Sequence, residues 1–215
     1  YKYTKDLLMN VPLPSPYPNI YRNEGDMSNW GLELAINSVN IEKNDWRWTT
    51  DFNISMNRNK LEKLNLQQVY YYTQTSEALS EYVVRMTPGQ PLSQFWGYTA
   101  KGVDPETGMI IYEDYNGDGK VNVADKHYIG DANPLFTAGL TNTISWKGLN
   151  LSFLLTSSVG NDIYNASKIE MIGMYTGGNQ IKDVVRRWRI PGQITDIPKA
   201  GELDNLRAST RWIED

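Results

Sequence analysis

The feature that most constrains the fold of this sequence is an alternation of apolar and polar side chains with a period of two residues. Between Trp46 and Met56, one set of alternate residues is apolar apart from a single threonine. The residues between them are all polar, namely Arg47, Thr49, Asp51, Asn53 and Ser55. Because neighbouring side chains of a β-strand point to opposite faces of the sheet, this segment is predicted to be a strand with one apolar and one polar face.

The same alternation predicts two hairpins. Their strands and turns are expected at residues 30–40, 41–45 and 46–56, and again at 137–146, 147–148 and 149–156. In each hairpin a tryptophan, Trp46 or Trp146, lies beside the short turn. Short turns with aromatic residues just inside them are typical of the periplasmic rim of an outer-membrane β-barrel, and small hydroxyl and amide side chains suit its wet lumen. A water-soluble β-sandwich also alternates in this way and stays open as the alternative.

Composition excludes some classes of protein and leaves the membrane question open. The 215 residues contain no run of eighteen apolar residues that could form a transmembrane helix. Barrel strands are short and half polar, so the mean hydropathy of -0.53 fits either a barrel or a soluble domain. Seven Trp and fourteen Tyr against four Phe favour interfaces that are apolar at one end and wet at the other, although carbohydrate sites share this preference.

Charge and cysteine content exclude further functions. A net charge of -4, with scattered Lys and Arg, gives no support to nucleic-acid binding. The absence of Cys excludes a disulfide scaffold and any Cys-based metal or nucleophile site. Residues 1–6 have neither the basic start nor the apolar centre of a signal peptide. This leaves a cytoplasmic protein or an internal fragment, of which the fragment is the favoured interpretation.

The segments between the hairpins, 59–90, 101–134 and 160–215, are too long to be simple loops of a compact domain. A barrel with short turns on one side and long loops on the other accommodates them. Within them the patterns predict strands at 82–86, 95–100 and 109–112, short helices at 161–171 and 179–189, and coil at 190–201.

One motif has the spacing of a calcium-binding loop, at residues 114–125. Oxygen-bearing side chains fall at its positions one, three, five and twelve, with Gly119 at position six, where the chain must turn sharply. Calcium takes six to eight oxygen ligands, and this spacing curls them around one point. The predicted ligands are the side chains of Asp114, Asn116, Asp118 and Asp125 and the backbone carbonyl of Lys120, with Asn122 acting through a water molecule.

The motif departs from an EF-hand in two ways. Asp125 stands where EF-hands carry Glu, and a shorter carboxylate weakens bidentate binding. The preceding residues 109–112 resemble a strand and not a helix, so a calcium loop without a complete EF-hand is predicted. The alternative is a polar double turn that binds no ion.

No other group of residues predicts chemistry. His127 is the only histidine, and a single histidine is more often a packing or surface residue than a catalytic one. The three arginines Arg186, Arg187 and Arg189 could face a ligand or partner, but a solvated helix face is the favoured interpretation. The scattered acidic residues offer no pair for hydrolysis. We therefore predict no catalytic residue and no enzymatic activity.

Several stretches of the sequence form a recognisable series. They are residues 6–14, 23–34, 57–60, the calcium-type loop 114–125, Ile129-Gly130, Asn133-Pro134, the Lys147-Gly148 turn and residues 160–165. Taken together, they resemble the SusC/RagA family of Bacteroidetes outer-membrane transporters. The resemblance covers about three quarters of the chain and is specific because its elements follow in the family's order; residues 66–90 and the loop after Met171 match poorly.

The resemblance implies a part of the C-terminal half of a TonB-dependent transporter in the bacterial outer membrane, spanning residues 1–215. The fold class would be all-β, an antiparallel transmembrane β-barrel fragment with long loops, short helices and the embedded calcium-type loop. The family's barrel has about 22 strands around a plug, and this chain lacks the plug, the TonB-contacting segment and the closing strands.

The implied function is active import of glycans or peptides. The implied partners are a SusD-like lipoprotein, TonB through regions outside this chain, an oligosaccharide or peptide substrate and outer-membrane lipid. The alternative function is that of a secreted calcium-binding β-domain, an adhesin or carbohydrate-binding module. Such a domain would bury its apolar face inside a β-sandwich, whereas a barrel would expose that face to lipid.

Overall fold

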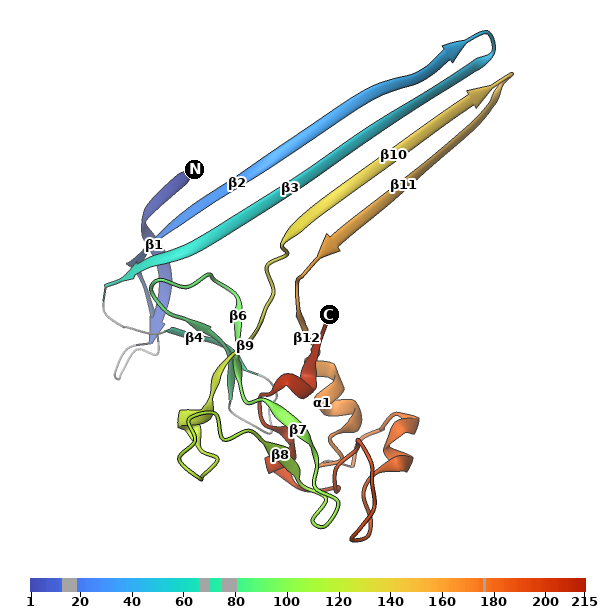
Figure 1. Ribbon diagram of the computed structural model, residues 1–215. Helices are drawn as coiled ribbons and strands as arrows, with labels where there is room; N and C mark the ends of the chain where they lie inside the picture. The colour runs from blue at the N-terminus through green and yellow to red at the C-terminus, as the bar shows by residue number, and fades with distance from the viewer. Residues whose placement is uncertain (13–18, 66–69, 75–80, 176) are drawn as a thin grey trace. The chain divides into compact units, whose positions relative to one another are not determined.

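The computed structural model describes residues 1–12, 19–65, 70–74, 81–175 and 177–215, and the described chain is mostly β-structure (Figure 1). The chain forms two compact units. One, here called the sheet unit, comprises residues 1–68, 88–91 and 133–161. The other, here called the loop unit, comprises residues 69–87, 92–132 and 162–215.

The sheet unit is a five-stranded antiparallel sheet of long strands, visible as blue, cyan and gold arrows in Figure 1. β2 and β3 form one hairpin, β10 and β11 form the other, and the two hairpins meet where β3 pairs with β10. In spatial order the strands are β1 (Lys2–Pro12), β2 (Asn19–Lys43), β3 (Trp46–Leu64), β10 (Phe136–Trp146) and β11 (Leu149–Val159).

The register of the sheet aligns the apolar residues of neighbouring strands. Phe52 of β3 lies opposite Ile36 of β2 and Leu140 of β10. Directly opposite residues of an antiparallel pair share a face, so an apolar surface runs across β2, β3, β10 and β11. Asn53, one residue along, lies on the other face with Gly139. The predicted hairpins and their faces are confirmed.

One of the two hairpin turns is shorter than predicted, and the other is as predicted. The link predicted at 41–45 contracts to Asn44-Asp45, since β2 continues to Lys43. Lys147-Gly148 forms the other turn as predicted, with φ of 46° and 85°. Positive φ at both positions matches the right-handed twist of the strands, and glycine adopts it without strain. Trp46 and Trp146 stack beside these turns with ring centroids 5.3 Å apart.

The apolar face contains a hydrogen-bonded polar group that the alternation did not reveal. Asn142 lies on it opposite Thr50 and is only 8% exposed. Its Oδ1 accepts hydrogen bonds from Thr50 Oγ1 at 2.7 Å and from Trp48 Nε1 at 2.9 Å. Asn40 Nδ2 donates to Thr50 Oγ1 at 2.6 Å. The predicted apolar face is therefore interrupted by polar side chains that satisfy one another.

Most of the apolar face has no cover within the described residues. Leu32 and Leu149 are each 68% exposed, and Leu155 is 59% exposed. β1 and β11 each pair on one side only among the described strands, so the sheet is not closed. Separately, none of the described helices is long and apolar enough to cross a membrane.

The loop unit is built from short strands around buried side chains. Its largest sheet has the order β4 (Tyr70–Gln74), β5 (Tyr82–Met86), β6 (Gln94–Gly97) and β9 (His127–Asp131). Two further pairs are β7 (Ala100–Val103) with β8 (Ile110–Tyr112), and β12 (Ile163–Tyr164) with β13 (Ile213–Glu214). The strands predicted at 82–86 and 109–112 are confirmed, whereas the one at 95–100 is divided between β6 and β7.

A compact apolar cluster forms the centre of the loop unit. Ile169 and Ile172 of α1 (Ala166–Ile172) pack with Leu206 and Trp212, which are each 1% exposed. Three short 3₁₀ turns bring the C-terminal residues onto this cluster: η2 (Lys182–Arg186), η3 (Leu203–Leu206) and η4 (Thr210–Trp212).

The helix predicted at 161–171 is partly correct. Ile163–Tyr164 instead forms strand β12, and α1 begins only after Asn165, whose side chain accepts a hydrogen bond from the Lys168 amide. Asparagine is a favoured residue at this position because its side chain satisfies a free amide of the first turn.

The helix predicted at 179–189 is wrong. Only η2 forms, and no side chain caps its start. Trp188 is drawn away from it, because its backbone amide donates to Ile197 O at 2.9 Å and its Nε1 donates to Pro105 O at 2.7 Å. These tertiary hydrogen bonds replace the helical ones that the sequence pattern suggested. The tract 190–201 contains no regular element, as predicted.

Candidate functional site

The calcium-type loop, residues 114–125, is held by its own carboxylates. Asp114 Oδ1 accepts hydrogen bonds from the amides of Gly117 (2.8 Å) and Asp118 (3.1 Å), and its Oδ2 accepts from Gly119 (2.7 Å). Asn116 Oδ1 accepts from the Asp118 amide at 2.9 Å. The chain can curl this tightly because Gly117 and Gly119 both have positive φ. The turn that the motif predicts is therefore formed.

Asp125 closes the loop from its other end and is fully buried. Its carboxylate accepts hydrogen bonds from the amides of Asn122 (2.7 Å), Tyr115 (2.9 Å) and Asn116 (3.2 Å). The Asn122 amide is the main reason that the pKa of the Asp125 carboxyl lies below its ordinary value, against the opposing effect of burial. The Asp125 carboxylate thus connects the two ends of the loop through hydrogen bonds.

The remaining predicted ligands lie close to one another on the loop. Asp118 Oδ2 is 3.3 Å from Asn116 Nδ2 and 3.4 Å from Asn122 Nδ2, and Asn122 Nδ2 donates to Lys120 O at 3.2 Å. Among the described residues, no group of three or more His, Cys, Asp or Glu side chains is placed to hold a metal ion. The donor set is thus of the oxygen type that calcium prefers, but its three carboxylates do not converge in this conformation.

His127, two residues after the end of the loop, has a packing role. Its Nδ1 is 3.0 Å from Asp125 O and its Nε2 is 3.0 Å from Thr99 Oγ1. Tyr115 stacks on its ring at 4.0 Å between centroids. Both ring nitrogens and one ring face are in contact with other residues, so the histidine connects the loop to Thr99, the residue before β7.

Lys126 attaches the end of the loop to the rest of the loop unit. Its Nζ forms an ion pair with Glu81 at 2.9 Å, with only 12% and 22% of the two side chains exposed. The other carboxylate oxygen of Glu81 accepts from the Ala208 amide at 2.8 Å. This partly buried pair was not foreseen, because its members are far apart in sequence and neither belongs to a motif.

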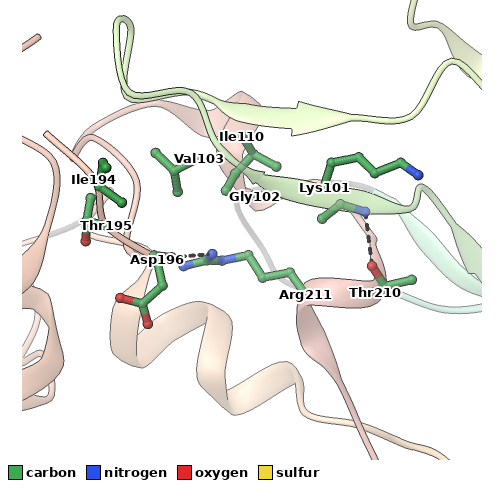
Figure 2. Close-up of a pocket in the computed structure, with 10 residues that line it drawn as sticks. Lys101, Gly102, Val103, Ile110, Ile194, Thr195, Asp196, Thr210 and Arg211 are labelled. Carbon is green, nitrogen blue, oxygen red and sulfur yellow. Dashed lines mark hydrogen bonds between the residues drawn. The ribbon is translucent and has the colours of Figure 1, made fainter. Parts of the chain in front are cut away.

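A second site, which the sequence did not predict, is an open pocket of about 580 Å³ in the loop unit (Figure 2). It lies between the β7–β8 pair and two C-terminal segments. Figure 2 shows Arg211 extended toward Asp196, to whose backbone carbonyl its Nη1 donates a hydrogen bond. The Ala100 amide donates to Thr210 Oγ1 at 3.0 Å. The lining residues are Ala100, Lys101, Gly102, Val103, Ile110, Ile194, Thr195, Asp196, Thr210 and Arg211.

The three arginines near residue 187 are occupied within the loop unit. Arg186 forms ion pairs with Asp196 at 3.0 Å and Asp183 at 3.6 Å. Arg187 and Arg189 donate to the backbone carbonyls of Val184 and Val185. Their expected position on a helix face does not hold, since that helix is absent, but Arg186 and Arg189 are exposed as expected.

Known proteins define the class to which this arrangement belongs. The chain is 30% identical to "TonB-dependent receptor P3" of Formosa agariphila over 99% of this chain and 23% of that protein. It is 27% identical to "TonB-dependent receptor SusC" of Bacteroides thetaiotaomicron over 82% of this chain and 19% of that protein. No family model matches the sequence.

Solved structures show the same fold. The "RagAB peptide transporter" matches with a TM-score of 0.81 at 24% identity, covering 99% of this chain and 24% of that one. The "RagAB peptide importer in the 'closed-closed' state" matches with a TM-score of 0.79 at 25% identity, again over 99% and 24% of the two chains.

The chain is therefore a SusC/RagA-like part of a TonB-dependent receptor, and its location is the bacterial outer membrane. It spans about a quarter of the length of the relatives that it matches. The resemblance inferred from the sequence is confirmed, and so is the predicted location.

Proposed function

We propose that the chain is part of an outer-membrane active transporter that imports glycans or peptides, energised through TonB. The observation that carries this proposal is the mainly apolar surface across β2, β3, β10 and β11, with polar side chains on the opposite face. A barrel strand needs this division between lipid and lumen. The receptor relatives and the RagAB peptide importer support it.

The same proposal places residues 1–215 in the C-terminal half of the barrel. Strands supplied by the rest of the protein would pair with β1 and β11 and close the sheet, because a sheet edge exposed to lipid leaves backbone groups unsatisfied. A SusD-like lipoprotein is the proposed partner, by analogy with SusC and RagAB. TonB would act through regions outside these residues. None of the proposed roles requires an enzymatic step.

The test is uptake by cells that carry the intact protein. Fluorescent oligosaccharides and peptides should enter the periplasm when both the protein and TonB are present, and should remain outside when either is deleted. Entry that is independent of TonB would contradict active import. A purified intact protein that is monodisperse without detergent would favour the secreted β-domain instead.

We also propose that the loop 114–125 binds calcium through Asp114, Asn116, Asp118, Lys120 O and Asp125. The observation in favour is that the turn is already formed, with the side-chain amides of Asn116 and Asn122 at 3.3 Å and 3.4 Å from Asp118 Oδ2. Binding would draw the carboxylates together, with the cation replacing the present contacts between amide nitrogens and Asp118.

The calcium proposal is tested by Asp118→Ala in the intact protein. Millimolar calcium should slow amide hydrogen exchange in residues 114–125 of the wild type but not of the variant, since a central ligand is lost. Asp215→Ala, which removes an exposed carboxylate outside the loop, is the control and should keep the calcium response. An unchanged exchange rate in the wild type would refute binding.

A further inference from the structure

The pocket in Figure 2 has walls that are mainly apolar. Val103 and Ile110 come from the β7–β8 pair, and Ile194 comes from the C-terminal coil. Ile194 is 94% exposed, so its aliphatic side chain is accessible to a ligand at the pocket. Ligand sites are commonly apolar cavities of 300–1,000 Å³ with a few polar groups that orient the ligand. The volume of about 580 Å³ lies within that range.

Two of the three charged lining residues are neutralised by neighbours. Lys101 Nζ lies 2.7 Å from a carboxylate oxygen of Glu113. Asp196 forms its ion pair with Arg186 at 3.0 Å. These two pairs leave the pocket without net charge from Lys101 or Asp196.

Arg211 is different, because it has no ion-pair partner among the described residues. Its Nη1 donates to the backbone carbonyl of Asp196 at 2.8 Å. Its Nε is buried and has no hydrogen-bond partner in the described part of the chain. A guanidinium stays protonated in proteins, so a positive charge without an ion pair in the described part of the chain lies at the pocket. Partly buried charges without a partner are unfavourable, and an incoming anion would relieve that.

We propose that this pocket binds a carboxylate carried next to an aliphatic group, as at the C-terminal residue of a short apolar peptide. Arg211 would hold the carboxylate, because guanidinium and carboxylate groups match in geometry. Val103, Ile110 and Ile194 would contact the aliphatic side chain. The proposal rests on the proposed import function and names the chemistry of one ligand group.

An acidic saccharide also carries carboxylates, but the lining fits it less well. None of the ten lining residues is aromatic, so the pocket offers no ring on which a sugar could stack. Its uncharged side chains are mostly aliphatic and would leave sugar hydroxyls without partners. A peptide end is therefore the occupant that the observations favour.

The test measures binding of short N-acetylated aliphatic peptides to the intact protein in detergent. Each peptide is used with a free C-terminal carboxylate and as its C-terminal amide. The free acid should bind at least about tenfold more tightly, because only the carboxylate can form a charge-assisted hydrogen bond with the guanidinium. In Arg211→Gln this preference should fall below about twofold. Ile194→Asn, at an exposed position, should weaken binding of both forms equally.

Equal binding of acid and amide by the wild type would overturn the proposal, and so would binding of uronate oligosaccharides alone. If Arg211→Gln does not fold, the proposal is judged on two other results. They are the ratio of acid to amide affinity in the wild type and the affinity of both peptides for Ile194→Asn. Import of oligomers without any carboxylate preference would refute this inference while leaving the transport function intact. Absence of TonB-dependent import would refute the transport function itself.

Discussion

The sheet unit and the loop unit use apolar residues in opposite ways. Of the buried apolar side chains in the described residues, Leu61 alone belongs to the sheet unit, and the others belong to the loop unit. The sheet unit instead displays leucine, isoleucine and phenylalanine on one face. The loop unit thus carries its own core, whereas the sheet unit requires an apolar surrounding. The comparison shows that apolar content alone does not indicate where the apolar side chains go.

The largest effect is expected when the surrounding is removed. Expressed alone in detergent-free buffer, the 215-residue chain should aggregate, because its apolar face and open strand edges are exposed. Size-exclusion chromatography with light scattering measures this directly. A folded, monodisperse monomer would mean that the two units do not differ as described.

A substitution in the loop unit tests whether its core is self-contained. Trp212→Ala should destabilise that unit by about 3–5 kcal/mol, as expected for a fully buried tryptophan. Hydrogen exchange in the intact protein should rise in the loop unit and stay unchanged in the sheet strands. Trp146→Ala, at a tryptophan that is 39% exposed, is the matched control and should leave the loop unit unaffected. Similar exchange in both variants would contradict the distinction.

A pair of neighbouring substitutions tests the two faces of the sheet. Phe52→Arg places a cation on the apolar face, which costs roughly 2–4 kcal/mol at the middle of a membrane, and should impair assembly of the intact barrel. Asn53→Arg places it on the polar face and should be tolerated far better. Heat-modifiable migration on gels reports assembly. Equal tolerance, or the reverse order, would mean that the faces or their environment are misassigned.

The smallest expected effect concerns acid sensitivity of the loop 114–125. Because amide donors lower the pKa of Asp125, the folded loop gains stability above the ordinary carboxyl pKa of 3.8. That contribution is lost as the pH falls through the lowered pKa of the folded state. An acid-active protease should therefore cleave the loop readily only when the pH is below the ordinary carboxyl pKa, because the loop is destabilised there. Asp125→Asn should remove this pH dependence, whereas persistence of it would exclude Asp125 as its origin.

Local sequence patterns predicted the sheet well but underestimated its length. Side-chain alternation reports a strand only while one face is apolar, and β3 continues beyond Met56 through Asn57, Arg58 and Asn59 to Leu64. The backbone ladder persists there without an apolar stripe. Asn142 was missed for a related reason, since its partners Trp48 and Thr50 lie far away in sequence and pair with it only through the register.

The loop unit was less predictable because its structure depends on distant contacts. The spacing of Asp114 to Asp125 predicted the turn, but could not show that Asp125 would accept hydrogen bonds from three backbone amides. The pocket around Arg211 combines β7, β8 and the C-terminal residues, which share no sequence motif. The false helix at 179–189 followed a helical spacing that the contacts of Trp188 override.

The pairing of β3 with β10 has a consequence for how the chain can fold and vary. Each hairpin joins residues that are close in sequence, whereas Trp46 opposite Trp146 requires the whole intervening segment to be closed into a loop. Such long-range pairing forms slowly, so the hairpins are expected to form first and to join later. The entropy of closure grows only logarithmically, by about 0.6 kcal/mol for each doubling of length. The segment between the hairpins can therefore lengthen or shorten greatly while the sheet that carries it stays the same.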